Sequence, residues 1–406
     1  MKIRSITYFC NPKYPLEEVI LRQAGQFLTQ ARSAYQAAGY EVQTVRLATI
    51  PFPQLLGEIN LRRLPELTGQ MDEIARQLRI SYFSLGPAFP EMPLSYEVIP
   101  DAIFVSKNAF FGGVMAGNTG SGQSTAKVYL DAVRACAEVI VKCSTLEPNG
   151  FANLQFAALA NVRPGAPFLP AAYHEGEEPA FAIATEAADL AVRAFENVKS
   201  LEEGRRNLIS EIEKHGRKLA QVAKSLNCKF GGIDFSLAPF PDDAHSLGNA
   251  VETMGIPRIG LHGSLAAAAI LTESIDRADF PHTGFSGFMQ PVLEDSVLAK
   301  RAAEGTLTVK DVLLYSAVCG TGLDTIPLPG DTPSEHIVPL LLDLCALALR
   351  LDKPLTARLM PIPGKQAGDL TNFDFAFFAR SKVMALEAAP LLLPFAGPEA
   401  LSITKR

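Results

Sequence analysis

The sequence lacks the features that would assign a nucleic-acid or membrane function at once. No run rich in Lys or Arg is present and the formal net charge is −6, so a nucleic-acid partner is not expected. No apolar stretch is long enough to cross a membrane, because the best candidate, residues 337–351, contains Pro339 and Asp343. The N-terminus runs directly into an alternating segment rather than a leader-like apolar core. We therefore expect a cytoplasmic protein with no nucleic-acid and no membrane partner.

Paired cysteines are also missing. The six cysteines are scattered and none forms a Cys-x-x-Cys pair, so neither a disulfide framework nor a zinc knuckle is indicated. Reduced thiols are the plain interpretation. The 406 residues, 48% of them hydrophobic, exceed what one simple core usually holds, so we expect two lobes or one elaborate barrel.

Hydrophobic periodicity predicts an α/β protein. Residues 2–9 and 40–47 alternate as strands, and residues 15–38 between them have helical spacing. This β-α-β opening favours parallel strands joined by a crossover helix. Residues 101–105 are predicted as a short strand and residues 124–142 as a long helix.

A charged helical segment, residues 185–225, separates the two halves of the chain. We place the boundary near Leu201, giving a first α/β half over 1–200 and a second over 201–406, which together could form one barrel domain. In the second half, residues 230–237 and 356–360 are expected to be strands. Helices are expected at residues 246–254, 264–277, 308–317 and 333–351, the last with Thr332 as its cap and Glu335 completing a capping box.

The segment of residues 117–125 is rich in glycine and opens the predicted helix. It has phosphate-loop spacing, but Gln123 stands where that motif requires a lysine. Nucleotide hydrolysis is therefore disfavoured. Anion binding by Ser124 and Thr125 at the helix N-terminus needs no lysine, and a simple capped turn explains the same residues.

Two histidines are candidates for acid–base chemistry. His174 lies among Glu175, Glu177 and Glu178 and could ligate a divalent cation or transfer a proton; a solvated acidic turn has the same composition. His262 precedes a helix that begins at Ser264, where a ligand could approach. A histidine that caps a turn is the alternative.

Further candidates are a cysteine and two carboxylates. Cys319 lies in a glycine-rich turn before Asp324, and its thiol would be a nucleophile only if its pKa were lowered; a small buried cysteine is the alternative. Asp234 lies on the polar face of an otherwise apolar strand. If that face lines a closed barrel, the Asp234 carboxylate is buried and needs hydrogen-bonding partners. A strand with one solvated face is the alternative.

The phrase apolar-Pro-apolar-Pro-Gly occurs twice, at residues 326–330 and 360–364. Asp331 follows the first copy, and Lys365 and Asp369 follow the second. Lys365 is the best single candidate for holding an anionic group, with a surface lysine on a turn as the alternative.

Several phrases together resemble the family called domain of unknown function 711, or uncharacterised protein family 0210. They are residues 230–239, 261–268, 318–324, 326–333 and 361–369. The resemblance implies a pyruvate formate-lyase-like fold, a ten-stranded α/β barrel of two parallel five-stranded halves surrounded by helices. It makes Cys319 the analogue of an inserted cysteine. Glycyl-radical chemistry is not expected, because Pro398 follows Gly397 where radical members have a different motif.

These observations lead to one hypothesis and one alternative. The hypothesis is a cytoplasmic, homo-oligomeric enzyme that acts on a small anionic metabolite inside the barrel, with a divalent cation as a possible cofactor. The catalytic candidates are His262, His174, Cys319, Asp234 and Asp324, and the ligand-binding candidates are Ser124, Thr125, Ser264, Asp331, Lys365 and Asp369. The alternative is a non-catalytic protein that senses a small ligand or binds a partner. A metal is not identified by the sequence.

Overall fold

A single large sheet runs through the chain in the computed structural model, which describes residues 1–117, 126–398 and 400–405. Nine strands follow the order β8-β7-β1-β2-β3-β4-β6-β10-β9, and β5 and β11 join at β4. The strands are β1 Lys2–Cys10, β2 Val42–Thr49, β3 Tyr82–Ala88, β4 Ala109–Gly117, β5 Lys127–Tyr129, β6 Phe156–Ala160, β7 Ala180–Glu186, β8 Lys229–Asp234, β9 Gly322–Pro329, β10 Leu355–Ile362 and β11 Ala400–Ser402.

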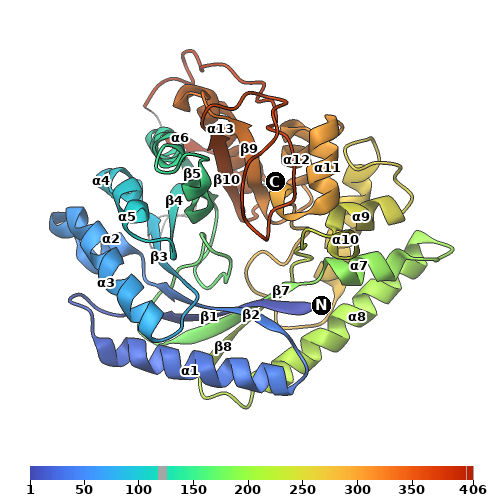
Figure 1. Ribbon diagram of the computed structural model, residues 1–406, viewed down its shortest axis with the longest axis horizontal. Helices are drawn as coiled ribbons and strands as arrows, with labels where there is room; N and C mark the ends of the chain where they lie inside the picture. Colours follow the sequence, from blue (N-terminus) through green and yellow to red (C-terminus); the bar gives the residue numbers. More distant parts are fainter. Residues whose placement is uncertain (118–125, 399, 406) are drawn as a thin grey trace.

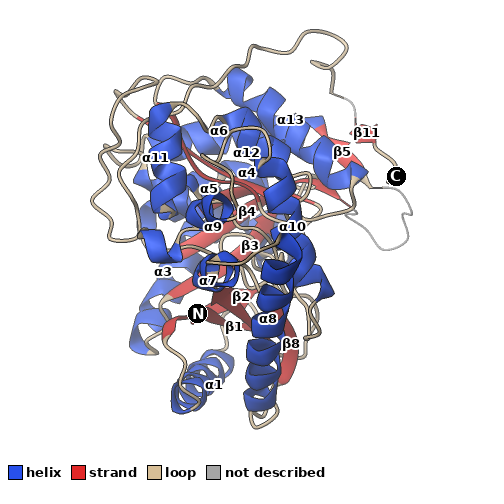
Figure 2. Cartoon of the chain, turned by 90° about the vertical axis from the view of Figure 1, so that its right-hand side faces the viewer, coloured by secondary structure: helices blue, strands red, loops and turns tan. Residues whose placement is uncertain are grey.

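Helices surround this sheet (Figure 1). The α-helices are α1 Glu18–Ala37, α2 Phe52–Leu56, α3 Leu64–Gln77, α4 Leu94–Glu97, α5 Ile99–Val105, α6 Leu130–Ser144, α7 Ala188–Phe195, α8 Leu201–Ala223, α9 Leu247–Thr253, α10 Ser264–Arg277, α11 Ser296–Glu304, α12 Val309–Tyr315 and α13 Ser334–Arg350. Short 3-10 turns are η1 Glu58–Arg63, η2 Phe151–Gln155, η3 Asp243–His245 and η4 Val292–Glu294. Helices α1 and α8 lie side by side (Figure 2), joined by the Tyr35 hydroxyl, which donates to the Leu219 carbonyl at 3.2 Å.

The predicted β-α-β opening is confirmed. Strands β1 and β2 are parallel with α1 between them in sequence, and Phe27 of α1 packs on Tyr8 of β1 with ring centroids 5.2 Å apart. Such a crossover places the helix on one face of the sheet and leaves the other face for a different covering.

The strands form blocks of opposite direction. Strands β1, β2, β3, β4 and β6 are mutually parallel, whereas the β7–β8 pair and the β9–β10 pair run the other way. In the described chain the end strands β8 and β9 are not paired with each other. Residues 281–291 lie between them and make isolated bridges, from His282 to Ile233 and from Pro291 to Asp324. The α/β class with a large, mostly parallel sheet is therefore confirmed, but the sheet is not the closed ten-stranded barrel that was expected.

The inner face of the sheet wraps around the segment of residues 166–172. Phe168 packs in one cluster with Leu159 of β6 and Met289, and Leu169 packs in another with Phe9 of β1 and Phe110 of β4. The Thr7 hydroxyl donates to the Pro167 carbonyl at 3.3 Å and the Ser84 hydroxyl to the Ala172 carbonyl at 2.7 Å. An irregular segment can lie in the interior only because strand side chains satisfy its backbone.

Three predicted elements were wrong or incomplete. Residues 101–105 belong to helix α5, because Pro100 suits the first helical turn and the buried residues Ile99, Ala102 and Ile103 have helical spacing. Helix α13 has no side-chain cap, since the Thr332 hydroxyl donates to the Pro329 carbonyl at 2.7 Å instead. Residues 127–129 form β5, so α6 begins only at Leu130.

No helix in the described chain is long and apolar enough to span a membrane.

Candidate functional site

A cavity of about 150 Å³ lies against the inner face of the sheet, beside residues 167–169. It faces the starts of β1 to β4 and the ends of β7 and β8, so opposite strand directions meet at one place. Its polar wall is formed by Arg4, Gln43, Thr44, Arg46, Tyr82, Lys107, Thr185, Asp234, Ser236, Glu294 and Arg358. Its apolar wall is formed by Phe110, Phe151, Leu154, Pro167, Phe168, Leu169, Ala184, Ala238, Met289, Phe375 and Phe377.

Irregular strand geometry brings Arg4 to this cavity. The register between β1 and β7 shifts between Ile3 and Ser5, so Arg4 occupies a β-bulge. A bulge changes the direction of a side chain and is common beside functional sites. The guanidinium of Arg4 pairs with Glu294 and, at 3.3 Å, with Glu186.

A second irregularity holds Arg358. The register between β10 and β9 shifts between Ala357 and Leu359, and Thr325 opposite has a φ of 44°, which is strained for a β-branched residue. Arg358 donates from Nε to Asp324 at 2.5 Å and from an Nη atom to Glu294 at 2.9 Å. Both bonds lie in the interior.

The pKa values of the buried carboxylates in this network shift in different directions. Burial raises the pKa of Glu186 and of Asp324, and one oxygen of each is buried without a hydrogen-bonding partner in the described chain. Burial would also raise the pKa of Glu294, but Arg4 and Arg358 together lower it. Glu294 therefore carries a negative charge that the two arginines share.

Arg46 is the cation of the cavity that has no carboxylate partner among the described residues. Its Nε donates to the Thr44 hydroxyl at 2.9 Å, and its guanidinium lies over the ring of Tyr82, 5.8 Å from the centroid. Its two terminal nitrogens are left without a hydrogen-bonding partner in the part of the chain that the structure describes. Burial, followed by repulsion from Arg4, lowers the pKa of Arg46 to about 9. The side chain is therefore charged at neutral pH, and Glu294 offsets that charge only in part and without a hydrogen bond.

Asp234 is the predicted site residue that lines the cavity. Its carboxylate accepts hydrogen bonds from the Ser236 hydroxyl at 2.5 Å and from the backbone N–H groups of Phe285 and Ser286, each at 2.9 Å. Gly284 has a φ of 64° and lies so close that a Cβ there would collide with this carboxylate. Burial raises the pKa of Asp234 despite these bonds.

The other predicted residues lie elsewhere. Asp324 is one step behind the cavity wall, bonded to Arg358. His262 is exposed, and the Ser264 hydroxyl donates to the Leu261 carbonyl at 2.7 Å within its own turn. Ser124 and Thr125 lie outside the described residues.

The two Pro-Gly turns form a separate cluster outside the cavity. Gly330 donates its N–H to the Lys365 carbonyl at 3.0 Å. The Gln366 side chain donates to Asp331 at 2.9 Å, and its backbone N–H donates to Asp369 at 2.8 Å. Asp331 and Asp369 are exposed and Lys365 is half-buried. The structure thus brings these three residues together, at the ends of β9 and β10, but away from Asp234.

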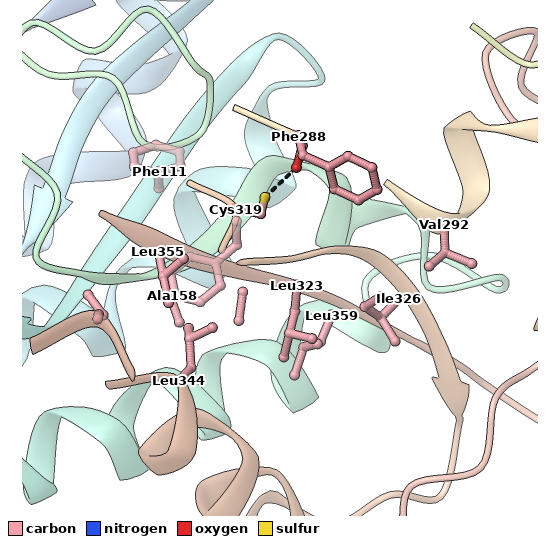
Figure 3. Packing of buried hydrophobic residues seen from close by; sticks show 14 of the residues in the cluster. Phe111, Ala158, Phe288, Val292, Cys319, Leu323, Ile326, Leu344, Leu355 and Leu359 are labelled. Carbon is pink, nitrogen blue, oxygen red and sulfur yellow. Dashed lines mark hydrogen bonds between the residues drawn. The ribbon is translucent and has the colours of Figure 1, made fainter. Parts of the chain in front are cut away.

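His174 and Cys319 are both buried and separate from the cavity wall. His174 packs near Phe9, with ring centroids 6.3 Å apart, and burial lowers its pKa. The Cys319 thiol donates to the Phe288 carbonyl, and core residues such as Leu323 and Leu355 lie nearby (Figure 3). Burial raises the pKa of Cys319, so the thiol is protonated and lacks the activation that a nucleophile needs.

Arg4, Arg46, Arg358, Glu186 and Glu294 were missed in the sequence. A usable signal exists for the arginines, because Arg46 and Arg358 are single charges inside strands that are otherwise uncharged. An arginine within a buried strand is rare unless it is paired or binds a ligand.

No group of three or more His, Cys, Asp and Glu side chains within residues 1–117, 126–398 and 400–405 could hold a metal ion. The described cavity is instead dominated by arginine, which favours anions over cations.

The fold and the cavity define an α/β protein with an internal, arginine-containing pocket. The chain matches the family model described as "Uncharacterised ACR (DUF711)" over residues 1–378, and it belongs to this family. A UPF0210 protein of Pyrobaculum islandicum is 32% identical over 86% of this chain and 79% of its own length. UPF0210 proteins of Neisseria meningitidis and Methanocaldococcus jannaschii are 27% and 25% identical, over 84% and 87% of this chain. The resemblance seen in the sequence is therefore confirmed at the level of the family, whose function is uncharacterised.

Proposed function

We propose that this protein is an enzyme that binds a small anionic metabolite at Arg46 and transfers a proton to or from it through Asp234. The observation that carries the proposal is the guanidinium of Arg46, which lines the cavity without a carboxylate partner among the described residues. A planar guanidinium with two free nitrogens matches a carboxylate in two parallel hydrogen bonds.

The volume of the cavity supports a small ligand. A cavity of about 150 Å³ is comparable to one that accepts a benzene-sized molecule. A nucleotide is much larger, so the altered phosphate-loop motif at residues 117–125 is not part of the proposal.

Asp234 is the best proton-transfer group on the wall. Its raised pKa brings its protonated and charged forms closer in energy, which suits an acid–base residue. The surrounding hydrogen bonds would hold the carboxylate in one orientation. His174 and His262 are not needed in this scheme.

The experiment is a thermal-shift panel of small carboxylates, amino acids, phosphates and nucleotides, each with and without a divalent cation. A ligand at one hundred times its Kd should add about 2.7 kcal/mol of stability. We expect hits among small carboxylates that disappear in Arg46→Met and persist in Lys365→Ala, the matched control outside the cavity. Hits that depend on Lys365 instead of Arg46 would overturn the assignment of the site.

Turnover is tested separately with Asp234→Asn. This change keeps the size of the side chain and removes the titratable proton, but its NH2 group must face one of the two backbone N–H groups that the carboxylate accepts from. Ligand binding by the variant is therefore measured first, and conversion of the bound ligand should fall at least about a hundredfold. The second candidate function, ligand sensing without turnover, is favoured by the three hydrogen bonds that already engage Asp234. A ligand that binds tightly but is recovered unchanged after long incubation would support sensing.

We further propose that residues 281–291 take the place of a tenth strand, making the fold pyruvate formate-lyase-like. The blocks of opposite strand direction and the two isolated bridges support this relation. Glycyl-radical chemistry is not part of the proposal, because Pro398 follows Gly397 and a shared fold does not transfer a reaction.

A further inference from the structure

Four cations line the cavity, Arg4, Arg46, Lys107 and Arg358, and Lys107 pairs with Glu147. Arg4 is held by Glu186 and Glu294, and Arg358 is held by Glu294 and Asp324. Within the described chain only Arg46, of these three arginines, keeps its terminal nitrogens free of a carboxylate. A ligand with one negative charge would complete the set of ion pairs.

A second negative charge on the ligand would be unfavourable. Glu294 and Asp234 both line the cavity, and Glu294 is held in its charged form by its arginines. The second charge of a dicarboxylate or a phosphate dianion would meet no further unpaired cation among the described wall residues, because Arg4, Lys107 and Arg358 already have carboxylate partners. It would lie near Glu294 in a poorly solvated space, where like charges repel strongly. The wall therefore selects against dianions.

The rest of the ligand must be apolar. The apolar part of the wall includes Phe110, Phe168, Leu169, Met289 and Phe375, and the Phe168 ring lies against the Arg358 guanidinium, 5.6 Å from ring centroid to Cζ. Phe110, Phe168, Leu169 and Met289 are buried, and Phe168 stacks edge-on with Phe285, their ring centroids 5.3 Å apart. A polar body placed against this wall would lose its hydration without gaining partners.

A separate part of the chain completes this apolar wall. Phe375 and Phe377 come from the extended segment after β10, and Phe375 packs on Phe151 with ring centroids 5.1 Å apart. Backbone hydrogen bonds hold the segment in place, from Ala379 to the Leu293 carbonyl at 2.7 Å and from Thr371 to the Ser381 carbonyl at 3.0 Å. The aromatic rings therefore belong to the pocket rather than to a loose tail.

We infer that the ligand is a small monocarboxylate with an apolar aromatic or branched aliphatic body. Its carboxylate pairs with Arg46, and its body lies against Phe168 and Met289. The Tyr82 hydroxyl, which has no hydrogen-bonding partner in the described chain, is a second donor at the same cavity. The volume of about 150 Å³ limits the body to about the size of one ring. This inference rests on the proposed anion site and adds the chemical class of its ligand.

The test is isothermal titration of the full chain, at constant ionic strength, with phenylacetate, 3-methylbutanoate, acetate, succinate and inorganic phosphate. We expect phenylacetate and 3-methylbutanoate to bind at least tenfold more tightly than acetate, and succinate and phosphate to bind more weakly than phenylacetate. In Arg46→Met the affinity for phenylacetate should fall at least tenfold. The neutral analogue benzyl alcohol should bind wild type and Arg46→Met to within threefold.

A second variant tests the apolar wall. Met289→Gln has a similar side-chain volume and should weaken phenylacetate at least fivefold while leaving acetate within twofold. Unchanged acetate binding also reports that the variant is folded and that its anion site is intact.

The outcomes separate this inference from the proposed function. If succinate or phosphate binds best and still requires Arg46, the anion site stands and the monocarboxylate class is overturned. If phenylacetate binds Arg46→Met as tightly as wild type, the placement of the carboxylate is overturned. If none of the five anions binds the wild-type protein, both proposals fail.

Discussion

Replacing Arg46 should stabilise the protein while removing the proposed anion site. Arg46→Met exchanges a guanidinium for an apolar side chain that fits beside the Tyr82 ring. Burial and Arg4 lower the pKa of Arg46 to about 9, so the folded state holds the proton less tightly than the unfolded chain does. At pH 7 the group is charged in both states, and the folded state bears the cost of that charge.

The magnitude follows from this pKa. Each pH unit by which a pKa falls corresponds to about 1.4 kcal/mol, so the fall from 12.5 to about 9 would cost about 5 kcal/mol in a dry site. The side chain is not fully buried and faces a cavity, and water there screens the charge, so we expect about 1–2 kcal/mol to be recovered. For a chain of 406 residues that is a rise in Tm of about 1–2 °C.

The sign of the pH dependence provides a second check. Between the folded pKa near 9 and the higher pKa of the unfolded chain, the unfolded state binds more protons, so wild-type stability gains a favourable contribution as pH rises. This contribution should be missing in Arg46→Met, and the two stability curves should converge above pH 9.

The assay is urea unfolding of wild type, Arg46→Met and Lys365→Met at pH 7 and pH 9.5. Lys365→Met is the matched control, because it removes a cation from the turn outside the cavity and should change the free energy of unfolding by less than about 0.5 kcal/mol. A loss of 2 kcal/mol or more in Arg46→Met would refute the reasoning, because it would mean that Arg46 is compensated within the fold.

Three further outcomes follow from other buried groups. Asp295 accepts hydrogen bonds of 2.6 to 3.2 Å from a serine hydroxyl and four backbone N–H groups at the starts of α9 and α11. Asp295→Ala should therefore lower the free energy of urea unfolding by about 3 kcal/mol, and a loss below about 1 kcal/mol would contradict this. Cys319 should react with iodoacetamide much more slowly in the native protein than after unfolding, because burial raises its pKa. The half-buried Cys228 is the internal comparison by mass spectrometry. Equal native rates for the two cysteines would contradict a buried, protonated Cys319 thiol. Burial lowers the pKa of His174, so wild type should lose stability as pH falls below about 6.5, the ordinary value for histidine. His174→Asn should weaken that loss in thermal scans from pH 7 to 5.5, leaving the part due to His215, whose pKa is also lowered; an unchanged slope would count against a neutral buried ring.

Much of the fold could be predicted from the sequence, because its signals are local. Helix α10 spans Ser264–Arg277 as predicted, and β1, α1 and β2 were found from their periodicity. The segment 101–105 failed because five residues are too few to separate a strand from a short buried helix without their neighbours. The antiparallel pairings of β7 with β1 and of β6 with β10 have no local signal in the sequence.

The site was harder to predict, because glycine-rich turns have two physical origins. Gly330 is required by packing, since a Cβ there would collide with the carbonyl of Ile362. The two apolar-Pro-apolar-Pro-Gly phrases are therefore explained by the neighbouring ends of the parallel strands β9 and β10. Asp331 and Lys365 follow those glycines and were noticed for that reason. Sequence alone cannot separate a glycine that admits a ligand from one that admits another backbone.

The contrast between Asp295 and Arg46 argues that the cavity is kept for function. Asp295 is a buried charge whose oxygens are fully engaged by the chain, as expected of a group that stabilises the fold. The guanidinium of Arg46 also carries a charge inside the protein, but it makes a single hydrogen bond in the described chain, to the Thr44 hydroxyl. The two strand irregularities hold Arg4 and Arg358, which line the same cavity, and the strained Thr325 lies opposite Arg358. Such local costs persist where a bound molecule supplies the missing partner, and an apolar residue at position 46 would otherwise be the more stable choice.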